Sequence, residues 1–311
     1  MKDIGITMDI RIFIGAHRTA GLHIENILAQ NETLLADQGI IVASHALQLS
    51  AFKNATLALD AGDKQQDVSD AYINALTKGA DFEKLIILDR RRCGSVTRPA
   101  RKNLIFPQVR YSLGRFSKYL PADSYRFFMG LRAPSTFLPS CYSESLTHAK
   151  VETFDDFLED TDLRALRWSE TLERILRSFS DDEAEESQKT KLVTWRFEDY
   201  PRMWRDVVGS LCGIENPQDL VGDALPVNQG LSLYGCQLMY QYLQEHEPKA
   251  PGDFKKVRDA FLEKFAHQDE MDPDPIGPPE FIESLDYAYD DDWYYIQRME
   301  NVVALSAQPR I

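Results

Sequence analysis

Two short stretches of the chain carry side chains that could hold a phosphate or sulfate group. The first, GAHRTAGLH, covers residues 15–23 and contains two glycines, the cation Arg18 and the hydroxyl of Thr19. Backbone amides of a glycine-containing turn, one cation and one hydroxyl are the parts of a phosphate-binding loop. It is not a Walker A motif, because five residues separate Gly15 from Gly21 and leucine follows where that motif has lysine. An ordinary turn with a solvated arginine is the alternative interpretation.

The second stretch, LRAPSTFLPSCYSE, covers residues 131–144. Pro134 ends the strand expected before it, and the residues after Ser135 can begin a helix. Arg132 and Ser140 then lie a short loop and one helical turn apart, where a guanidinium and a hydroxyl can converge on one phosphate. Either stretch alone is weak support for an anion site, and the two together are much stronger.

The elements expected around these stretches place both at the end of a strand. Short apolar runs predict five strands, at Ile10–Gly15, Gly39–Ala43, Leu85–Leu88, Tyr125–Leu131 and Leu192–Trp195. Apolar residues at helical spacing predict helices at Leu22–Gln38, Ala71–Lys78, Val109–Tyr119 and Leu163–Phe179. Because helices separate the strands, we expect right-handed crossovers and a mostly parallel sheet covered on both faces. Ligands of such sheets bind beyond the carboxyl ends of the strands, where both stretches begin.

We therefore expect an α/β protein with three layers, a central, mostly parallel five-stranded sheet and a helical C-terminal half. Residues 1–311 form a single domain in this interpretation, because no linker is flanked by two complete patterns. A Pro-rich loop is predicted at residues 272–279, before a C-terminal helical segment at residues 280–303. The acidic stretch at residues 180–191 is predicted to be a second loop.

Composition narrows the class of protein. The chain has 35 Lys and Arg against 49 Asp and Glu, a net charge of -14, so we expect no nucleic-acid partner, and any anion site must be local. We expect no membrane insertion, because no run of about 18 apolar residues occurs. The N-terminal apolar run is too short and interrupted for a signal peptide. The four cysteines lack metal-ligand spacing and are expected to be reduced structural thiols. These features predict a cytoplasmic protein and leave its oligomeric state open.

Together the two stretches resemble the P-loop sulfotransferases that use 3′-phosphoadenosine 5′-phosphosulfate (PAPS), especially the bacterial members. The first is similar to the family's G-x-[PH]-K-T-[GA]-T-T turn, which cradles the 5′-phosphosulfate. The second is similar to its R-x-P-x5-S motif, which binds the 3′-phosphate. The matching positions are Gly15, His17, Thr19 and Ala20 in the first stretch and Arg132, Pro134 and Ser140 in the second.

The likeness spans nearly the whole chain in the family's order. WRFEDY at residues 195–200 resembles the element yEDl, which closes the next strand. VNQGLS at residues 227–232 resembles the later element N-x-[SG]-L-S, and residues 289–296 resemble the terminal element Y-x-x-D-x-x-x-I. The resemblance implies a P-loop NTPase-like three-layer fold, PAPS as the sulfuryl donor, 3′,5′-adenosine bisphosphate as the product, and no metal.

The resemblance also implies roles for individual residues. The amides of residues 16–21 would hold the 5′-phosphate, Arg18 would stabilise the bridging phosphate oxygen, and Arg132 with Ser140 would hold the 3′-phosphate. The cofactor-binding residues in this interpretation are Gly15, Ala16, Arg18, Thr19, Ala20, Gly21, Arg132 and Ser140.

The first stretch departs from the family at three positions. Arg18 replaces the family's lysine, and Gly21 and Leu22 replace two threonines. Arginine is a planar fork that binds phosphate well but does not replace the compact charge of lysine. Each lost hydroxyl removes a hydrogen bond worth about 0.5–1.5 kcal/mol. We expect nucleotide binding to survive these changes better than turnover.

The acceptor side of the reaction is less well defined. Sulfuryl transfer needs a base for the acceptor's proton, and bacterial relatives often have a glutamate at the end of the third strand. Asp89 stands near that place and is one candidate base, with an ion pair to the arginines that follow it as the alternative. His17 is the other candidate base, because imidazole titrates near neutrality, with shaping of the turn as the alternative.

The chain has one dense run of basic residues. Its members are Arg90, Arg91, Arg92, Arg98, Arg101 and Lys102. A solvated face is the simplest interpretation, and the functional one is a surface for an anionic acceptor such as an acidic glycan, or a cover over the cofactor's phosphates. The histidines lack metal-ligand spacing, and the acidic run at residues 290–292 is typical of a helix start, so no metal is expected.

The sequence thus predicts an enzyme that transfers a sulfuryl group from PAPS to a hydroxyl or amine of a carbohydrate or small metabolite. The alternative is a catalytically impaired nucleotide- or ligand-binding protein on the same fold. A phosphoryl transferase is disfavoured, because the Walker A lysine is absent. The identity of the acceptor is not indicated by the sequence.

Overall fold

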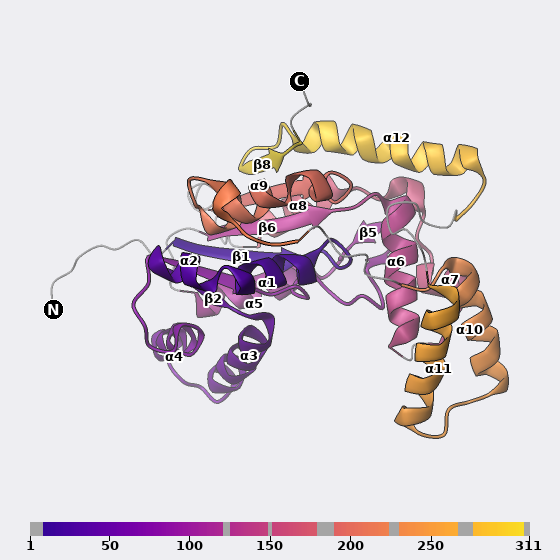
Figure 1. The fold of residues 1–311 in the computed structure, drawn as a ribbon, viewed down its shortest axis with the longest axis horizontal. Helices are drawn as coiled ribbons and strands as arrows, with labels where there is room; N and C mark the ends of the chain where they lie inside the picture. The colour runs from indigo at the N-terminus through magenta and orange to yellow at the C-terminus, as the bar shows by residue number, and fades with distance from the viewer. Residues whose placement is uncertain are drawn as a thin grey trace.

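The computed structural model describes residues 9–120, 125–148, 151–178, 190–223, 230–266 and 276–307. Within these ranges the main sheet contains six strands: β1 (Asp9–Gly15), β2 (Ile40–Ala43), β3 (Lys84–Leu88), β6 (Tyr125–Leu131), β7 (Thr190–Arg196) and β8 (Val302–Leu305). Their order is β2-β3-β1-β6-β7-β8, and every neighbouring pair is parallel (Figure 1). Strands β4 (Ala100–Arg101) and β5 (Leu104–Ile105) form a separate antiparallel pair.

The α/β class and the mostly parallel sheet are confirmed, because each of the five predicted strands is present at its expected place. The predicted number of strands is wrong. The chain leaves helix α12 (Pro279–Ile296) and returns to the sheet as β8, which pairs with β7. The four residues of β8 lie at the edge of the sheet and are only partly covered. A short apolar run of this kind cannot be told from the end of a helix by its periodicity.

Helices cover both faces of the sheet. The α-helices of the described ranges are α1 (Gly21–Gln30), α2 (Glu32–Asp37), α3 (His45–Asp60), α4 (Gln65–Thr77), α5 (Val109–Phe116), α6 (Pro134–Thr147), α7 (Phe154–Leu158), α8 (Trp168–Leu176), α9 (Tyr200–Cys212), α10 (Leu233–Glu245), α11 (Pro251–Phe265) and α12. Successive residues of a strand point to opposite faces. Ile12 accordingly belongs to a core formed with α3, α4, α5 and α8, whereas Phe13 belongs to a second core formed with α1, α2 and α9.

The C-terminal half is largely helical and gathers at one end of the sheet. Figure 1 shows α6, α7, α10 and α11 grouped at that end, while α12 runs along the top of the molecule between this group and β8. Contacts of α6 with α7, α10 and α12 hold the group together. This group therefore stands beside the loop that enters α6, which contains the second of the two candidate stretches.

The order of the strands places the two candidate stretches next to each other. The chain passes from β1 to β2 and β3 on one side of β1, and then crosses to β6 on its other side. The carboxyl ends of β1 and β6 are therefore the switch point of the sheet, where the loops leave in opposite directions and open a crevice. Residues 15–21 follow β1 and residues 132–140 follow β6, so both stretches border this crevice.

All four predicted helices have different bounds in the structure. The helix expected at Ala71–Lys78 begins earlier, as α4 at Gln65, and the helix expected at Val109–Tyr119 ends as α5 at Phe116, before a short 3-10 turn. The helix expected at Leu22–Gln38 is split into α1 and α2 at Asn31, whose side chain donates to the carbonyls of Ile27 and Val221 at 2.7 Å each. Asparagine often competes in this way with the hydrogen bonds of a helix. The helix expected at Leu163–Phe179 begins later, as α8, after a short 3-10 turn.

Several sequence features lie partly outside the described residues. They are residues 180–189 of the acidic stretch, residues 272–275 of the Pro-rich stretch, and residues 227–229 of the VNQGLS element. All four cysteines are described, and each is a buried free thiol, as predicted. Among the described helices, none combines the length and the apolar character needed to cross a membrane.

Candidate functional site

The turn between β1 and α1 packs closely against the segment that follows β3. Gly15 has a φ of +110°, and a Cβ there would lie 2.9 Å from the carbonyl oxygen of Arg90, so only glycine fits. Arg18 and Ala20 have left-handed φ values of 58° and 67°, which are uncommon for residues with a Cβ. A turn with left-handed residues can direct successive amides inward and form a concave site for an anion.

The amino end of α1 completes this turn. Its N-cap residue is Ala20, whose methyl group cannot accept a hydrogen bond, and the first turn of the helix has no acidic residue. The first amides of an α-helix lack partners within the helix and carry a partial positive charge. The predicted phosphate-binding turn is therefore shaped and polarised for an anion.

Thr19 and Ala16 hold the turn together rather than facing a ligand. The Thr19 hydroxyl donates to the carbonyl of Ala16 at 2.7 Å, and the residue is fully buried. The amide of Ala16 donates to the carbonyl of Gly130 in β6 at 3.4 Å. These two residues, predicted as ligand contacts, thus position the turn against the sheet.

Arg18 and Arg132 meet at one hydroxyl group. Nε of Arg18 donates to Oγ of Ser140 at 2.8 Å, and Nη1 of Arg132 donates to the same oxygen at 3.4 Å. Nη1 of Arg132 also donates to the carbonyl of Arg18 at 3.1 Å. Because Oγ of Ser140 accepts two hydrogen bonds, its own hydrogen is directed elsewhere and can donate to a further acceptor. The structure therefore brings together the three charged or polar side chains that the sequence singled out.

Both guanidinium groups are shielded from water. Arg132 is 1% exposed, and the side chain of Arg18 is 8% exposed. Nε of Arg132 donates to Thr136 Oγ1 at 2.9 Å, and its guanidinium lies 4.7 Å from the ring centre of Phe197. Two like charges held this close in a partly dehydrated place are stabilised by a counter-anion. The arrangement suits a phosphate or sulfate group.

Glu144 and Gly230 belong to the same site and were not predicted. Oε2 of Glu144 lies 3.4 Å from Nη1 of Arg18, and the Glu144 side chain is 34% exposed. Gly230 approaches so closely that a Cβ there would lie 3.4 Å from Nη2 of Arg18. Both had a sequence signal: Glu144 follows Ser140 by four residues and so lies on the same face of α6, and Gly230 belongs to the VNQGLS element.

A partly buried carboxylate fixes the loop that carries Arg132. Oε1 of Glu198 accepts the amide hydrogen of Ala133 at 2.8 Å, and its other oxygen accepts the Tyr289 hydroxyl at 3.3 Å. Burial raises the pKa of Glu198, and the hydrogen bond from Ala133 acts in the opposite direction. The residues of the WRFEDY element and of the terminal element therefore meet behind the Arg132 loop.

Asp292 fixes the same loop from a second direction. Its carboxylate accepts the amide hydrogens of Trp168 and Ser169 at 2.6 and 3.2 Å, and so caps the amino end of α8. Nε1 of Trp168 then donates to the carbonyl of Arg132 at 2.8 Å. The acidic run at residues 290–292 was predicted to start a helix, but it lies inside α12, and its last residue stabilises the start of a different helix.

His17 packs the turn against the segment after β3. Its Nε2 lies 2.8 Å from the carbonyl of Gly94, so this nitrogen carries the hydrogen, and its ring contacts Phe106 with the ring centres 5.8 Å apart. Burial lowers the pKa of His17, and the hydrogen bond to Gly94 acts in the opposite direction. These contacts match the turn-shaping interpretation and leave Nδ1 as the basic nitrogen.

Asp89 lies apart from the meeting point of the two arginines. It is 1% exposed, and Oδ2 accepts hydrogen bonds from Nε2 of Gln48 at 2.9 Å and from Nε of Arg92 at 2.7 Å. Tyr72 in turn donates to Gln48. These contacts match the ion-pair interpretation, because a carboxylate enclosed in this way offers no face to an acceptor molecule.

The dense run of basic residues does not form one continuous cationic surface. Arg90 pairs with Glu25 at 3.1 Å, and Arg98 pairs with Glu152 and Glu159 at 2.7 and 2.8 Å. Arg101 pairs with Glu159 as well, and Arg92 pairs with Asp89. Most of these cations are therefore paired with acids from other parts of the chain, and the side chains of Arg98 and Arg101 remain partly exposed in these pairs.

The groups that meet at this site are two guanidiniums and a hydroxyl. Among the residues that the structure describes, no group of three or more His, Cys, Asp or Glu side chains is arranged to hold a metal ion. Neither a protein-family model nor a curated protein sequence matches the chain. Function must therefore be inferred from the groups that meet at the carboxyl ends of β1 and β6.

Proposed function

We propose that this protein binds a 3′-phosphorylated adenine nucleotide and transfers the sulfuryl group of PAPS to a hydroxyl or amine of a carbohydrate or small metabolite. The observation that carries the proposal is the meeting of Arg18 and Arg132 at the Ser140 hydroxyl. This point lies at the switch point of a parallel sheet, near the amino end of a helix, where phosphate groups bind in folds of this kind. The resemblance of both stretches to the PAPS-dependent sulfotransferases supports the same proposal.

The residues suit a ligand with two separate anionic groups. The amides at the start of α1 and of the turn around Arg18 would hold the 5′-phosphosulfate. Arg132 and Ser140 would hold the 3′-phosphate, because a buried guanidinium can bind two oxygens while the hydroxyl donates to a third. When bound, PAPS would supply a sulfuryl group already activated by its anhydride link to phosphate.

In this proposal, different residues of the chain accept the acceptor's proton and stabilise the leaving phosphate oxygen. The acceptor oxygen forms a bond to sulfur as the bond between sulfur and the bridging oxygen breaks, and the acceptor's proton moves to a base. Glu144 is the base in this proposal, because it lies beside Arg18 and is one-third exposed, whereas Asp89 is enclosed. Arg18 would stabilise the charge that develops on the leaving phosphate oxygen.

Calorimetry with three nucleotides tests the binding part of the proposal. We expect 3′,5′-adenosine bisphosphate to bind and to raise the melting temperature, and 5′-AMP and ATP to bind at least tenfold more weakly. A Ser140→Ala variant should lose most of this preference for the 3′-phosphate. Equal binding of 5′-AMP and the bisphosphate would show that Arg132 and Ser140 do not read a 3′-phosphate.

Glu144→Gln tests the transfer part. Loss of the negative charge beside Arg18 should strengthen binding of the bisphosphate about two- to fivefold, since the repulsion of the incoming anion is reduced. The same variant should slow transfer of radiolabelled sulfate from PAPS to a panel of glycans and small alcohols by about 100-fold, the size expected for a lost general base. Unchanged transfer would remove Glu144 from the mechanism.

A protein that binds the nucleotide without transfer is the second candidate. It is favoured by the inward-facing Thr19 hydroxyl and by Leu22, which is 51% exposed and has no donor to offer a sulfate. Combining Arg18→Lys with Leu22→Thr restores two groups of the family's turn. Gly21 is left in place, because a Cβ there would lie 2.9 Å from the Arg90 side chain. Tight bisphosphate binding without transfer by either protein would favour the binding role.

A further inference from the structure

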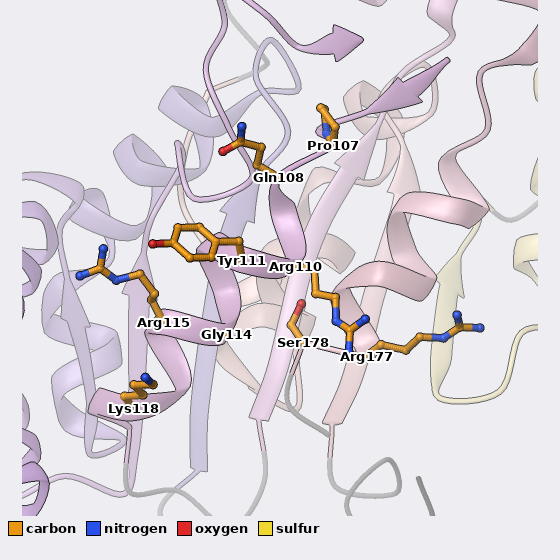
Figure 2. Close-up of a pocket in the computed structure, with 9 residues that line it drawn as sticks. All are labelled: Pro107, Gln108, Arg110, Tyr111, Gly114, Arg115, Lys118, Arg177 and Ser178. Carbon is orange, nitrogen blue, oxygen red and sulfur yellow. The ribbon is translucent and has the colours of Figure 1, made fainter. Parts of the chain in front are cut away.

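A second basic region lies outside the candidate site. It is a surface groove with a volume of about 790 Å³, lined by nine residues of α5, the segments flanking α5, and the end of α8 (Figure 2). The lining residues are Pro107, Gln108, Arg110, Tyr111, Gly114, Arg115, Lys118, Arg177 and Ser178. We call it the basic groove. None of these residues belongs to the site at the carboxyl ends of β1 and β6.

The charge of the groove is unusual for this protein. Four of its nine lining residues are cations and none is acidic, although the chain as a whole has a net charge of -14. Arg110 and Arg177 come from different elements, and Figure 2 shows the Arg110 guanidinium beside Ser178, whereas the Arg177 side chain extends away from it along the same surface. Arg177 also pairs with Glu173 at 3.3 Å, but both side chains are exposed, so the pair contributes little. The groove therefore concentrates positive potential on an otherwise acidic surface.

An exposed aromatic ring stands within this positive region. Tyr111 is 67% exposed, although tyrosine gains free energy when its ring is covered. A hydrogen bond to Tyr111 raises the pKa of Arg115, and Figure 2 shows the Arg115 guanidinium near the Tyr111 hydroxyl. Tyrosine and arginine are the residue types that most often dominate binding at protein interfaces. The groove thus offers an anchor for a partner as well as charge.

The dimensions of the groove suit a short peptide. Arg110 and Lys118 are eight residues apart along α5 and the turn after it, a distance of about 12 Å at the rise of an α-helix. An extended peptide covers that length with about four residues. We propose that the basic groove is a docking site for an acidic peptide segment of a partner protein, whose carboxylates pair with Arg110, Arg115, Lys118 and Arg177 while an adjoining side chain covers Tyr111.

Other polyanions fit the groove less well. Single-stranded nucleic acid is bound through repeated stacking on several aromatic rings, and Tyr111 is the single aromatic residue among the described lining residues. A simple phosphate would need neither the length of the groove nor an exposed ring.

Fluorescence anisotropy at low ionic strength tests the proposal. The probe is a labelled octapeptide of alternating Glu and Asp residues, with the Gln and Asn version as the neutral control. We expect Arg110→Gln combined with Arg177→Gln to weaken binding of the acidic probe at least tenfold, and Tyr111→Ala to weaken it about threefold. Arg202→Gln combined with Lys255→Gln is the matched control, because it removes two exposed cations from α9 and α11 and should leave binding unchanged.

A competing segment of the chain itself must be excluded. Ser178 is followed in the sequence, within residues 181–186, by five acidic residues. Each measurement is therefore repeated in a variant in which these five residues are Asn or Gln. The proposal is overturned if neither protein binds the acidic probe, if the groove and control variants weaken it equally, or if an octanucleotide binds the groove more tightly. Saturation with 3′,5′-adenosine bisphosphate should leave peptide binding unchanged, so the result is independent of the proposed sulfuryl transfer.

Discussion

The candidate site and the basic groove both gather positive charge, but they do so in opposite settings. At the candidate site, Arg132 is 1% exposed and shares the Ser140 hydroxyl with Arg18. At the groove, the Arg177 side chain is 68% exposed, and Tyr111 is largely exposed as well. Dehydration strengthens electrostatic interactions and fixes their geometry, whereas exposure leaves them weak and adaptable.

The comparison shows that buried cations can select one ligand by its shape, whereas exposed cations attract anions of many shapes. A small anion that enters the candidate site must match donors that are already fixed by Thr136, Ser140 and the carbonyl of Arg18. A ligand of the groove contacts long, exposed Arg and Lys side chains that can adopt many rotamers. We therefore expect specificity at the first region and salt-sensitive, tolerant binding at the second.

The largest expected effect is that of Arg132→Lys. Lysine keeps the charge but loses the planar fork, so affinity for 3′,5′-adenosine bisphosphate should fall about ten- to hundredfold. Binding of the acidic peptide to the groove should not change. Calorimetry of both ligands with one preparation of the variant measures the contrast, and a parallel loss of peptide binding would indicate a general defect in folding.

Added salt should weaken ligand binding at the groove more than at the candidate site. Exposed charges farther apart than about 8–10 Å are screened at physiological ionic strength, and buried pairs are screened much less. Raising the salt concentration from 0.01 to 0.15 M should therefore weaken peptide binding at the groove about tenfold, and bisphosphate binding by a smaller factor. Titrations at both salt concentrations provide the measurement, and an equal loss at both regions would contradict the comparison.

Removal of a single hydroxyl should have a moderate effect. Ser140→Ala deletes the group shared by Arg18 and Arg132, at a cost of about 0.5–1.5 kcal/mol in bisphosphate binding, or roughly three- to tenfold. The matched change in the groove is Ser178→Ala, where the hydroxyl already donates to the carbonyl of Arg174. We expect this second change to leave peptide binding unaltered, as anisotropy would show.

Two opposite substitutions should each stabilise the protein by about 0.5–1 kcal/mol. Ala20→Gly relieves a left-handed residue in the turn of the candidate site, where φ is 67°. Gly114→Ala improves the helix propensity of α5 at the groove, and its new Cβ would meet Ser178 at an ordinary 3.5 Å. Chemical denaturation gives both changes in the free energy of unfolding. Destabilisation by Ala20→Gly would show that the turn is not strained.

The smallest expected effect is a change with pH at the candidate site. Burial lowers the pKa of His17 below its usual value of 6.5, so the unfolded chain binds more protons than the folded one as pH falls below 6.5. The free energy of unfolding should therefore decrease between pH 7.5 and 5.5, and His17→Gln should reduce part of that decrease. The groove variant Arg110→Gln should show the wild-type slope. Identical slopes for all three proteins would rule out His17 as a contributor.

The amino-acid sequence by itself determined the class of the fold. The apolar runs before Gly15 and after Lys84 are short, β-branched and bounded by polar residues, which predicted buried strands, and the structure has strands there. The strand β8 escaped prediction, because four partly covered apolar residues after a long helix carry no period of their own. The break of the first helix at Asn31 escaped as well, because its carbonyl partner, Val221, is distant in the sequence.

The sequence also identified Arg18, Arg132 and Ser140, because their types and local spacing suit an anion. Only the tertiary structure decided how charges are shared. In the folded protein, Arg92 and Arg98, which belong to the basic run of the sequence, form ion pairs with acidic residues. The basic groove is lined by residues as far apart in the sequence as Arg110 and Arg177. The local sequence pattern shows which side chains the chain has. Ion pairing requires two side chains within a few ångströms of each other, and this depends on which elements the packed core brings together.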